Sequence, residues 1–78
     1  MHTLDNEKIA SVGIGHKYIF VELSDGKIIK IPLSYTKKLA HAKLIDLIDY
    51  KIIGNGRGIH FPKIDEDISL RGILRDLG

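Results

Sequence analysis

Residues 17–31 read KYIFVELSDGKIIKI, and this stretch decides the fold. Its first half is rich in aromatic and β-branched residues, which suits a strand, with Ile19, Val21 and Leu23 on one face and Tyr18, Phe20 and Glu22 on the other. Asp25-Gly26 follows, and this pair between two β-like runs is typical of a tight hairpin turn, because glycine tolerates the positive φ that the turn requires. Beyond the turn the apolar residues alternate again. The stretch therefore predicts two antiparallel strands, at 17–23 and 27–31.

A further strand is predicted on the N-terminal side of this hairpin, at 8–14. There, Ala10, Val12 and Ile14 alternate with small residues, and the glycines that follow provide a turn. Pro32 ends the third strand, because proline has no N–H to donate to a ladder. Together the three strands predict an antiparallel meander.

The residues after the meander predict helix, but one straight helix does not fit them. Ser34 is a natural N-cap, since its hydroxyl can accept a hydrogen bond from a free N–H two or three residues on. The apolar residues of 35–48 fall on two nearly opposite faces, and a single helix would expose one of them. We expect either two short helices with a break at 41–43, or a second face that contacts a partner chain. The first face holds Tyr35, Leu39 and Ala42, and the second holds Leu44, Leu47 and Ile48.

The second half of the chain adds extended segments and a final helix. Residues 50–53 predict a fourth strand that enters a glycine run at 54–58, and 59–61 is extended before a proline. These pieces form either a second hairpin or one bulged strand. An acidic turn follows at 65–67, and Ser69 caps a helix whose apolar residues recur at helical spacing: Leu70, Ile73, Leu74 and Leu77. The fold class is therefore α+β, an antiparallel sheet of three to four strands with short helices and a C-terminal helix.

Length and composition indicate one globular domain over residues 1–78. Hydrophobic residues make up 44% of the chain and charged residues 28%, which excludes a disordered acidic or basic tail. The 12 basic and 10 acidic residues give a net charge of +2, too small for a strong nucleic-acid field. A domain of this size buries little surface, so we expect association with a partner protein or as a homodimer.

The chain has no cysteine, which excludes disulfides and thiolate metal sites and fits a reducing cytoplasm. Its first residues have neither the basic nor the apolar part of a signal peptide. Its uninterrupted apolar runs are far shorter than the ~20 residues that cross a bilayer. We therefore expect a cytoplasmic protein that does not span a membrane.

Two features invite a catalytic or ligand-binding interpretation. The glycine run at 54–58 has neither the spacing of a dinucleotide fingerprint nor the Lys-Ser/Thr pair of a P-loop, so a hairpin or a close backbone approach is favoured over a phosphate cradle. His60 and the acids at 65–67 could ligate a divalent metal or transfer protons, but nothing fixes them in ligand geometry, and acids before a helix stabilise its positive end. No Ser–His–Asp pattern occurs. We expect no enzyme, no metal site and no cofactor.

Basic residues around the helical segment support an alternative function, a nucleic-acid-linked transcriptional regulator or accessory domain. Lys37, Lys38 and Lys43 surround this segment, and each lysine could neutralise one phosphate. The chain lacks, however, a helix-turn-helix pattern of sufficient length and an aromatic stacking motif. Solvated lysines are the simpler explanation, and any nucleic-acid binding is expected to be weak.

Several short motifs follow one another along the chain: DGK at 25–27, IPLSY at 31–35, Leu39 with Ala42, GNGRGIHFP at 54–62, IDEDIS at 64–69, and Leu74. In this order they resemble the bacterial domain-of-unknown-function family 2442 (DUF2442). The resemblance covers about residues 9–75, and its most specific part runs from Gly58 to Ser69. Two positions depart from the family pattern. Phe61 stands where the family mostly has Trp, and the connection from Ala42 to Tyr50 is apolar where the family is usually polar.

The resemblance implies a small α+β domain without an established catalytic activity. Members occur alone or fused to a helix-turn-helix domain, and short members often resemble the second gene of a toxin–antitoxin pair. The expected function is therefore a small protein-binding module, antitoxin-like, that covers another small protein such as a toxin.

The apolar departure from the family pattern supplies the expected contact surface. An exposed apolar patch usually marks an interface, although these residues could instead complete a small core. The acids of the predicted turn would attract a basic partner. The expected contact residues are Leu44, Leu47, Ile48, Asp65, Glu66 and Asp67.

Overall fold

The predicted meander forms the first sheet of the structure, a computed structural model that describes residues 7–78. Its strands pair in the order β1-β2-β3, with bounds β1 (Ile9–Ile14), β2 (Tyr18–Leu23) and β3 (Ile28–Pro32). Exposed and buried side chains alternate strictly along β2, as the sequence predicts. Gly26 has a φ of 91° in the turn between β2 and β3, the conformation that favours glycine there. The first six residues of the predicted domain lie outside the described part of the chain.

A bulge changes which residues of β1 face the core. The register shifts between Ile9 and Ser11, so Ala10 has no partner in the ladder. Ala10 is exposed, although simple alternation placed it on the face of Val12. The extra residue of the bulge lets Ile9 turn inward and become buried instead.

The helical segment divides into two short helices, one of the two arrangements expected. Two extended residues separate α1 (Lys37–His41) from α2 (Leu44–Leu47). The predicted N-cap is wrong, because Ser34 lies inside a 3₁₀ turn at Leu33–Tyr35. Thr36 has the extended backbone of a cap, and its hydroxyl accepts a hydrogen bond from the Leu39 N–H at 3.1 Å.

The rest of the chain forms a second antiparallel sheet of its own, in the order β4-β5-β6. Its strands are β4 (Lys51–Ile53), β5 (Gly58–Phe61) and β6 (Glu66–Ser69). The glycine run is the turn of the β4–β5 hairpin, one of the two arrangements expected. The acidic turn is wrong for two of its residues, since Glu66 and Asp67 lie on β6. Only Asp65 is in the turn, with a φ of 51° after the 3₁₀ turn at Pro62–Ile64.

The predicted C-terminal helix is α3 (Leu70–Leu77), and Ser69 caps it by accepting a hydrogen bond from the Gly72 N–H at 3.0 Å. Gly72 is buried inside this helix, where glycine costs up to ~1 kcal/mol relative to alanine. A Cβ at this position would lie 2.9 Å from the Ser69 Oγ and 3.7 Å from the Tyr35 hydroxyl. The close approach of the capping Ser69 hydroxyl therefore explains the glycine, while the Tyr35 hydroxyl is in ordinary van der Waals contact.

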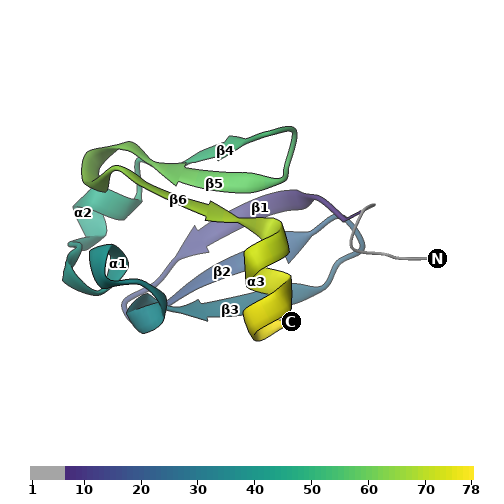
Figure 1. The fold of residues 1–78 in the computed structure, drawn as a ribbon, viewed down its shortest axis with the longest axis horizontal. Coiled ribbons are helices and arrows are strands. Elements are labelled where there is room, and N and C mark those ends of the chain that lie inside the picture. Colours follow the sequence, from purple (N-terminus) through teal and green to yellow (C-terminus); the bar gives the residue numbers. More distant parts are fainter. Residues whose placement is uncertain (1–6) are drawn as a thin grey trace.

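The two sheets lie one over the other and share one core (Figure 1). The molecule is 38 Å long and 18–20 Å across, with α1 and α2 at one end, and α3 packs against both β3 and β6. Burial of the apolar side chains of this core is the main force that stabilises a domain of this size without disulfides. The side chains with almost no exposure come from both sheets and all three helices: Ile19, Val21, Leu23, Ile31, Leu39, Leu47, Ile59, Phe61, Leu70 and Ile73.

The glycine run also joins the second sheet to the first. The Ile9 N–H donates a hydrogen bond to the Gly56 carbonyl at 2.8 Å. Gly56 is buried with a φ of 86°, and a Cβ there would lie 2.9 Å from the Lys8 Cβ. The close backbone approach expected from the sequence is therefore confirmed at this position.

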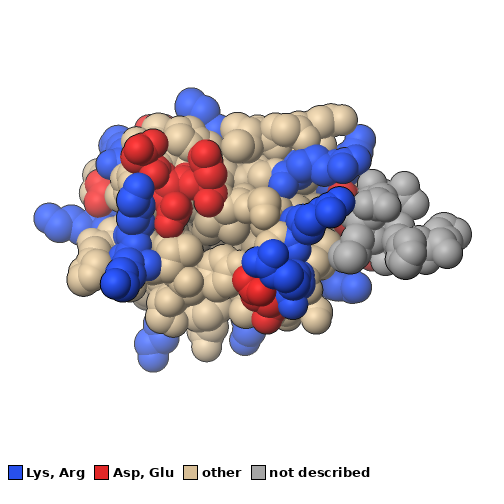
Figure 2. Space-filling model, viewed as in Figure 1, with Lys and Arg blue, Asp and Glu red and all other residues tan. Residues whose placement is uncertain are grey.

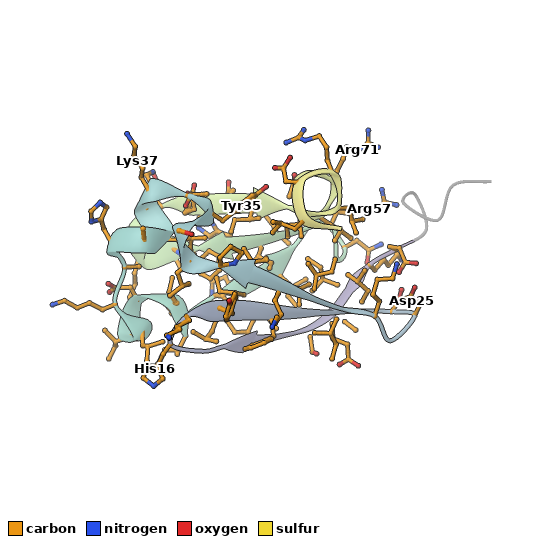
Figure 3. All side chains as sticks on the ribbon, turned by 90° about the horizontal axis from the view of Figure 1, so that it is seen from below. His16, Asp25, Tyr35, Lys37, Arg57 and Arg71 are labelled. Carbon is orange, nitrogen blue, oxygen red and sulfur yellow. The ribbon has the colours of Figure 1, made fainter. Side chains whose placement is uncertain are left out.

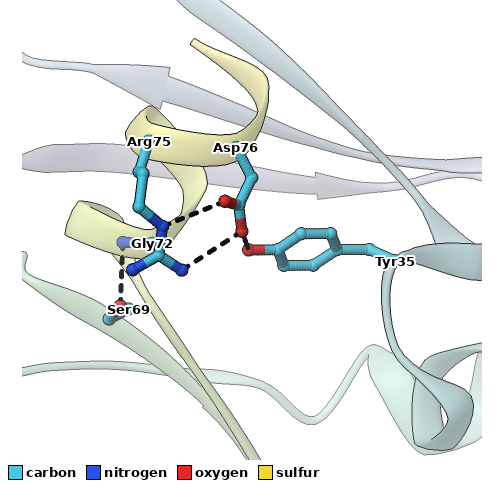
Figure 4. Close-up of polar contacts among 5 residues, drawn as sticks. All are labelled: Tyr35, Ser69, Gly72, Arg75 and Asp76. Carbon is cyan, nitrogen blue, oxygen red and sulfur yellow. Dashed lines mark hydrogen bonds and ion pairs between the residues drawn. The ribbon is translucent and has the colours of Figure 1, made fainter.

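A polar contact ties α3 to the segment after β3 (Figure 4). The Tyr35 hydroxyl donates to the Asp76 Oδ2 at 2.6 Å, and the Arg75 Nε donates to the Asp76 Oδ1 at 3.0 Å. The pKa of Asp76 is lowered, first by the hydrogen bond from Arg75 and then by that from Tyr35. The same carboxylate raises the pKa of Tyr35. The contact therefore favours an ionised Asp76 in the folded protein.

Acid should weaken this contact. A carboxyl group whose pKa is depressed by folding contributes stability above its unfolded value, and this contribution is lost as the pH falls through the folded value. We expect Asp76→Asn to lower the Tm by a few degrees at pH 7, and this difference to shrink as the pH falls below about 3.9, the ordinary aspartate value. Thermal unfolding of both proteins from pH 7 to pH 3 measures it. A Tm difference that stays constant with pH would show that the ionisation of Asp76 is not involved.

Candidate protein-binding site

Helix α2 presents exposed apolar side chains at one end of the molecule. Leu44, Ile45 and Ile48 are 36%, 61% and 60% exposed, and we call these three residues the α2 patch. Since α2 has only four residues, it has a single fully buried position, which Leu47 occupies. The other apolar side chains of this segment have no place in the core and face the solvent.

The assignment of Leu47 to a partner surface is wrong. Its side chain is fully buried and belongs to the core that the two sheets share. Helical periodicity grouped it with Leu44 and Ile48, but Leu47 and Ile48 lie at the two edges of that stripe, about 100° apart around the helix. Leu47 can therefore face the core while Ile48 faces the solvent.

A shallow hollow of about 300 Å³ lies between α1, α2 and the 3₁₀ turn at Pro62–Ile64. Lysine stems, Ala42 and Ile64 give it an apolar floor, and the charged groups lie at its rim. Such a surface can hold an apolar side chain of another molecule. The sequence did not predict it, because its residues come from three separate elements: Lys37, Lys38, His41, Ala42, Asp46 and Ile64.

Of the three predicted acidic contacts, Asp65 lies at the edge of this hollow, whereas Asp67 borders a different hollow with Arg57 and Ser69. Asp65 directly follows Ile64, and its carbonyl accepts a hydrogen bond from the Lys38 Nζ at 2.8 Å. Asp65 and Asp67 are exposed and Glu66 is half-buried. Figure 2 shows acidic side chains gathered toward one end of the visible face. The fold thus brings the acids and the α1–α2 segment, which the sequence considered separately, to one end of the molecule.

His60 meets one of the acids but not all three. His60 and Asp67 are cross-strand partners on β5 and β6, and the His60 Nδ1 lies 2.5 Å from the Asp67 Oδ1. Phe61 points to the opposite face and is fully buried, as expected for a strand. Among residues 7–78, no group of three or more histidine and acidic side chains could hold a metal ion. The imidazole–carboxylate pair is a single polar contact between two neighbouring strands.

The lysines of the nucleic-acid alternative lie at the same end as the acids. Lys37 and Lys38 border the hollow together with Asp46, while Lys43 does not border it and has its N–H bonded to the Asp46 carboxylate at 3.1 Å. Carboxylates so close to the lysines would repel phosphate groups and weaken their binding. This arrangement favours a protein contact with charges of both signs over a nucleic-acid contact.

No helix within residues 7–78 has the length and apolar character needed to cross a membrane.

Comparison with known proteins gives a family and a fold. The model of a family described as protein of unknown function, DUF2442, matches residues 9–77. A crystal structure of a protein of unknown function from Rhodospirillum rubrum ATCC 11170 is 25% identical with a TM-score of 0.80, over 88% of this chain and 86% of that one. A search of curated proteins gives no match.

A second similar structure was determined in solution by NMR, for an uncharacterised protein from Chromobacterium violaceum. It is 24% identical with a TM-score of 0.76, over 87% of this chain and 64% of that one. The present chain thus spans less than two thirds of the length of that protein, and this likeness concerns the fold alone.

Proposed function

Because the chain belongs to the DUF2442 family, whose fold by itself assigns no activity, we propose its function from its surface: a small protein-binding module. It covers another small protein, in the manner of an antitoxin, with the end of the molecule that carries α1 and α2. The observation that carries the proposal is the α2 patch, in which two isoleucines of one helical turn are about 60% exposed. Exposed apolar clusters of this kind are typical of interaction sites.

The surroundings of the patch define the chemistry of the partner. Apolar anchors of the partner would cover Ile45 and Ile48 and enter the neighbouring hollow, since interface energy concentrates in such desolvated contacts. Asp46 borders this hollow and Asp65 follows Ile64 at its edge, which favours a partner with basic residues around its apolar anchors. We therefore propose a small basic protein as the partner, and a toxin that acts on RNA is one protein of this kind.

The proposal does not assign an enzymatic role. The protein acts by binding, and the absence of cysteine from its sequence suits a reducing cytoplasm. A nucleic-acid-linked regulator using Lys37, Lys38 and Lys43 is the second candidate. The carboxylate of Asp46 beside these lysines disfavours phosphate binding, so we prefer protein binding.

Replacing both exposed isoleucines of the patch tests the proposal. We expect the tagged wild-type chain to capture one small basic protein from its host extract at near-equal amounts, and Ile45→Glu/Ile48→Glu to lose it. Two buried charges at the centre of an interface cost far more than the apolar contacts they replace. Mass spectrometry of the eluted proteins measures the yield.

The matched control is Ile28→Glu, because Ile28 is 61% exposed like Ile45 but lies on β3 in the first sheet, outside the α2 patch. It should capture the partner as the wild-type chain does, and circular dichroism should show all three baits folded. Capture that survives in Ile45→Glu/Ile48→Glu, or an elution without prey from the wild-type bait, would contradict the proposal.

A further inference from the structure

A second hollow, of about 370 Å³, lies between the β4–β5 turn and the start of α3. It is lined by Arg57, Ser69, Leu70 and Arg71. Arg57 and Arg71 lie near each other and toward the opposite end of the molecule from Lys37 (Figure 3). The two arginines are far apart in sequence, and the hydrogen bond from the Leu70 N–H to the Arg57 carbonyl, at 2.8 Å, brings their backbones together.

The glycine run holds Arg57 in this position. Gly54, Asn55 and Gly56 have successive φ values of 60°, 57° and 86°, so the chain turns back within three left-handed residues. The Arg57 N–H then bonds to the Ile53 carbonyl at 3.1 Å, and also contacts the Gly54 carbonyl at 3.2 Å. The backbone of Arg57 is therefore fixed at both its N–H and its carbonyl, which directs its side chain to the edge of the hollow.

A smaller hollow of about 180 Å³ adjoins the 370 Å³ hollow, since Arg57 and Ser69 line both. It extends over Ile53 and Gly58 toward Asp67. Gly58 has no side chain, and a Cβ there would lie 3.2 Å from the Ile68 carbonyl oxygen and 3.3 Å from the Ile53 side chain, so a side chain at this position would narrow the hollow. Together the two hollows combine a cationic region with an apolar region, the two surfaces that a nucleotide presents to a protein.

The two guanidinium groups supply the positive charge of this site. Arg57 and Arg71 line the same hollow and lie near each other in Figure 3. The local potential beside them is therefore more positive than the net charge of +2 suggests. Guanidinium groups also match the geometry of phosphate oxygens better than ammonium groups do.

We propose that Arg57 and Arg71, together with the Ser69 hydroxyl, bind the phosphate of a nucleotide, either in a single RNA strand or as a mononucleotide. The base or ribose would lie against Ile53 and Gly58. Both arginines already interact with other groups of the protein, but a guanidinium has five N–H donors and can add a phosphate to these contacts. Asp67 borders the smaller hollow as well as being an expected protein contact, but the two arginines lie toward the opposite end of the molecule from Lys37, and neither proposal depends on the other.

Fluorescence anisotropy of a labelled oligouridylate of about twelve nucleotides, titrated with the full chain at low salt, tests the site. We expect Arg57→Gln/Arg71→Gln to weaken binding roughly tenfold or more, and to reduce the slope of log K against log salt by about 1 to 2. Displacement of the label by UMP would support recognition of a single nucleotide. Resistance to UMP would support a strand held at several nucleotides.

The matched control removes the same charge elsewhere. Lys37→Gln/Lys38→Gln also loses two positive charges, and it should weaken binding less than about threefold. Arg75→Gln removes an arginine of the same helix that Asp76 already holds, and it should behave in the same way. Equal losses in both double variants, or no binding of oligouridylate by the wild-type chain, would overturn the proposal. Circular dichroism of each variant excludes unfolding as the cause.

Discussion

Replacing Phe61 with alanine is expected to unfold most of the protein at 25 °C. Its side chain is the largest one that is fully buried, and it projects from β5 into the core shared by both sheets. Truncation of a buried phenylalanine costs about 3–5 kcal/mol, which equals the whole stability expected of a small domain without disulfides or metals. Urea titration followed by circular dichroism measures the free energy of unfolding.

The chain supplies its own control for this experiment, because its other phenylalanine lies on the solvent face of the first sheet. Phe20 is 39% exposed on β2, and its ring centroid is 6.2 Å from that of Tyr18. Phe20→Ala should cost only about 1 kcal/mol, the value of one aromatic pair. Equal urea midpoints for the two variants would contradict a core centred on Phe61.

The second large effect is expected from Gly56→Ala. A left-handed conformation costs an alanine about 1–2 kcal/mol, and the contact of the new Cβ with the Lys8 Cβ at 2.9 Å adds about 1–3 kcal/mol of overpacking. The substitution should also weaken the Ile9–Gly56 hydrogen bond that joins the two sheets. Thermal and urea unfolding measure the loss.

Gly26→Ala separates the two causes. Gly26 has nearly the same φ, 91° against 86°, but a Cβ there would have no atom within 4 Å. It should therefore show the conformational cost of about 1–2 kcal/mol alone. If Gly26→Ala and Gly56→Ala were equally destabilised, the close approach between the sheets would have no energetic role.

The first half of the fold is predictable because local pattern and tertiary packing agree there. The alternation along β2 and the Asp25-Gly26 turn follow from residue order, and the division of the helical segment was one of the two arrangements that residue order left open. The sequence did not predict strand β6, because its first two residues are acidic and Ile68 is its one buried residue, so no period-two signal exists. Its pairing with β5 depends on contacts that residue order alone does not reveal.

The candidate sites were also harder to predict, because they depend on contacts between elements far apart in the sequence. Leu44 and Ile48 are exposed as expected, but the burial of the Leu47 side chain depends on a helix that is only one turn long. The His60–Asp67 pair arises from strand register. The two arginines meet only through the Leu70–Arg57 hydrogen bond, and the sequence offered the glycine run as their one signal. Sites assembled from several elements leave little trace in a single sequence.

The binding affinity of the purified partner for three forms of the chain tests the central claim most directly. The claim is that the α2 patch is the contact surface for a protein, and isothermal titration of the wild-type chain, Ile45→Glu/Ile48→Glu and Ile28→Glu measures it. We expect the double variant to bind at least about tenfold more weakly and Ile28→Glu to match the wild-type chain. Equal dissociation constants for all three folded forms would contradict the claim and move the interface away from α2.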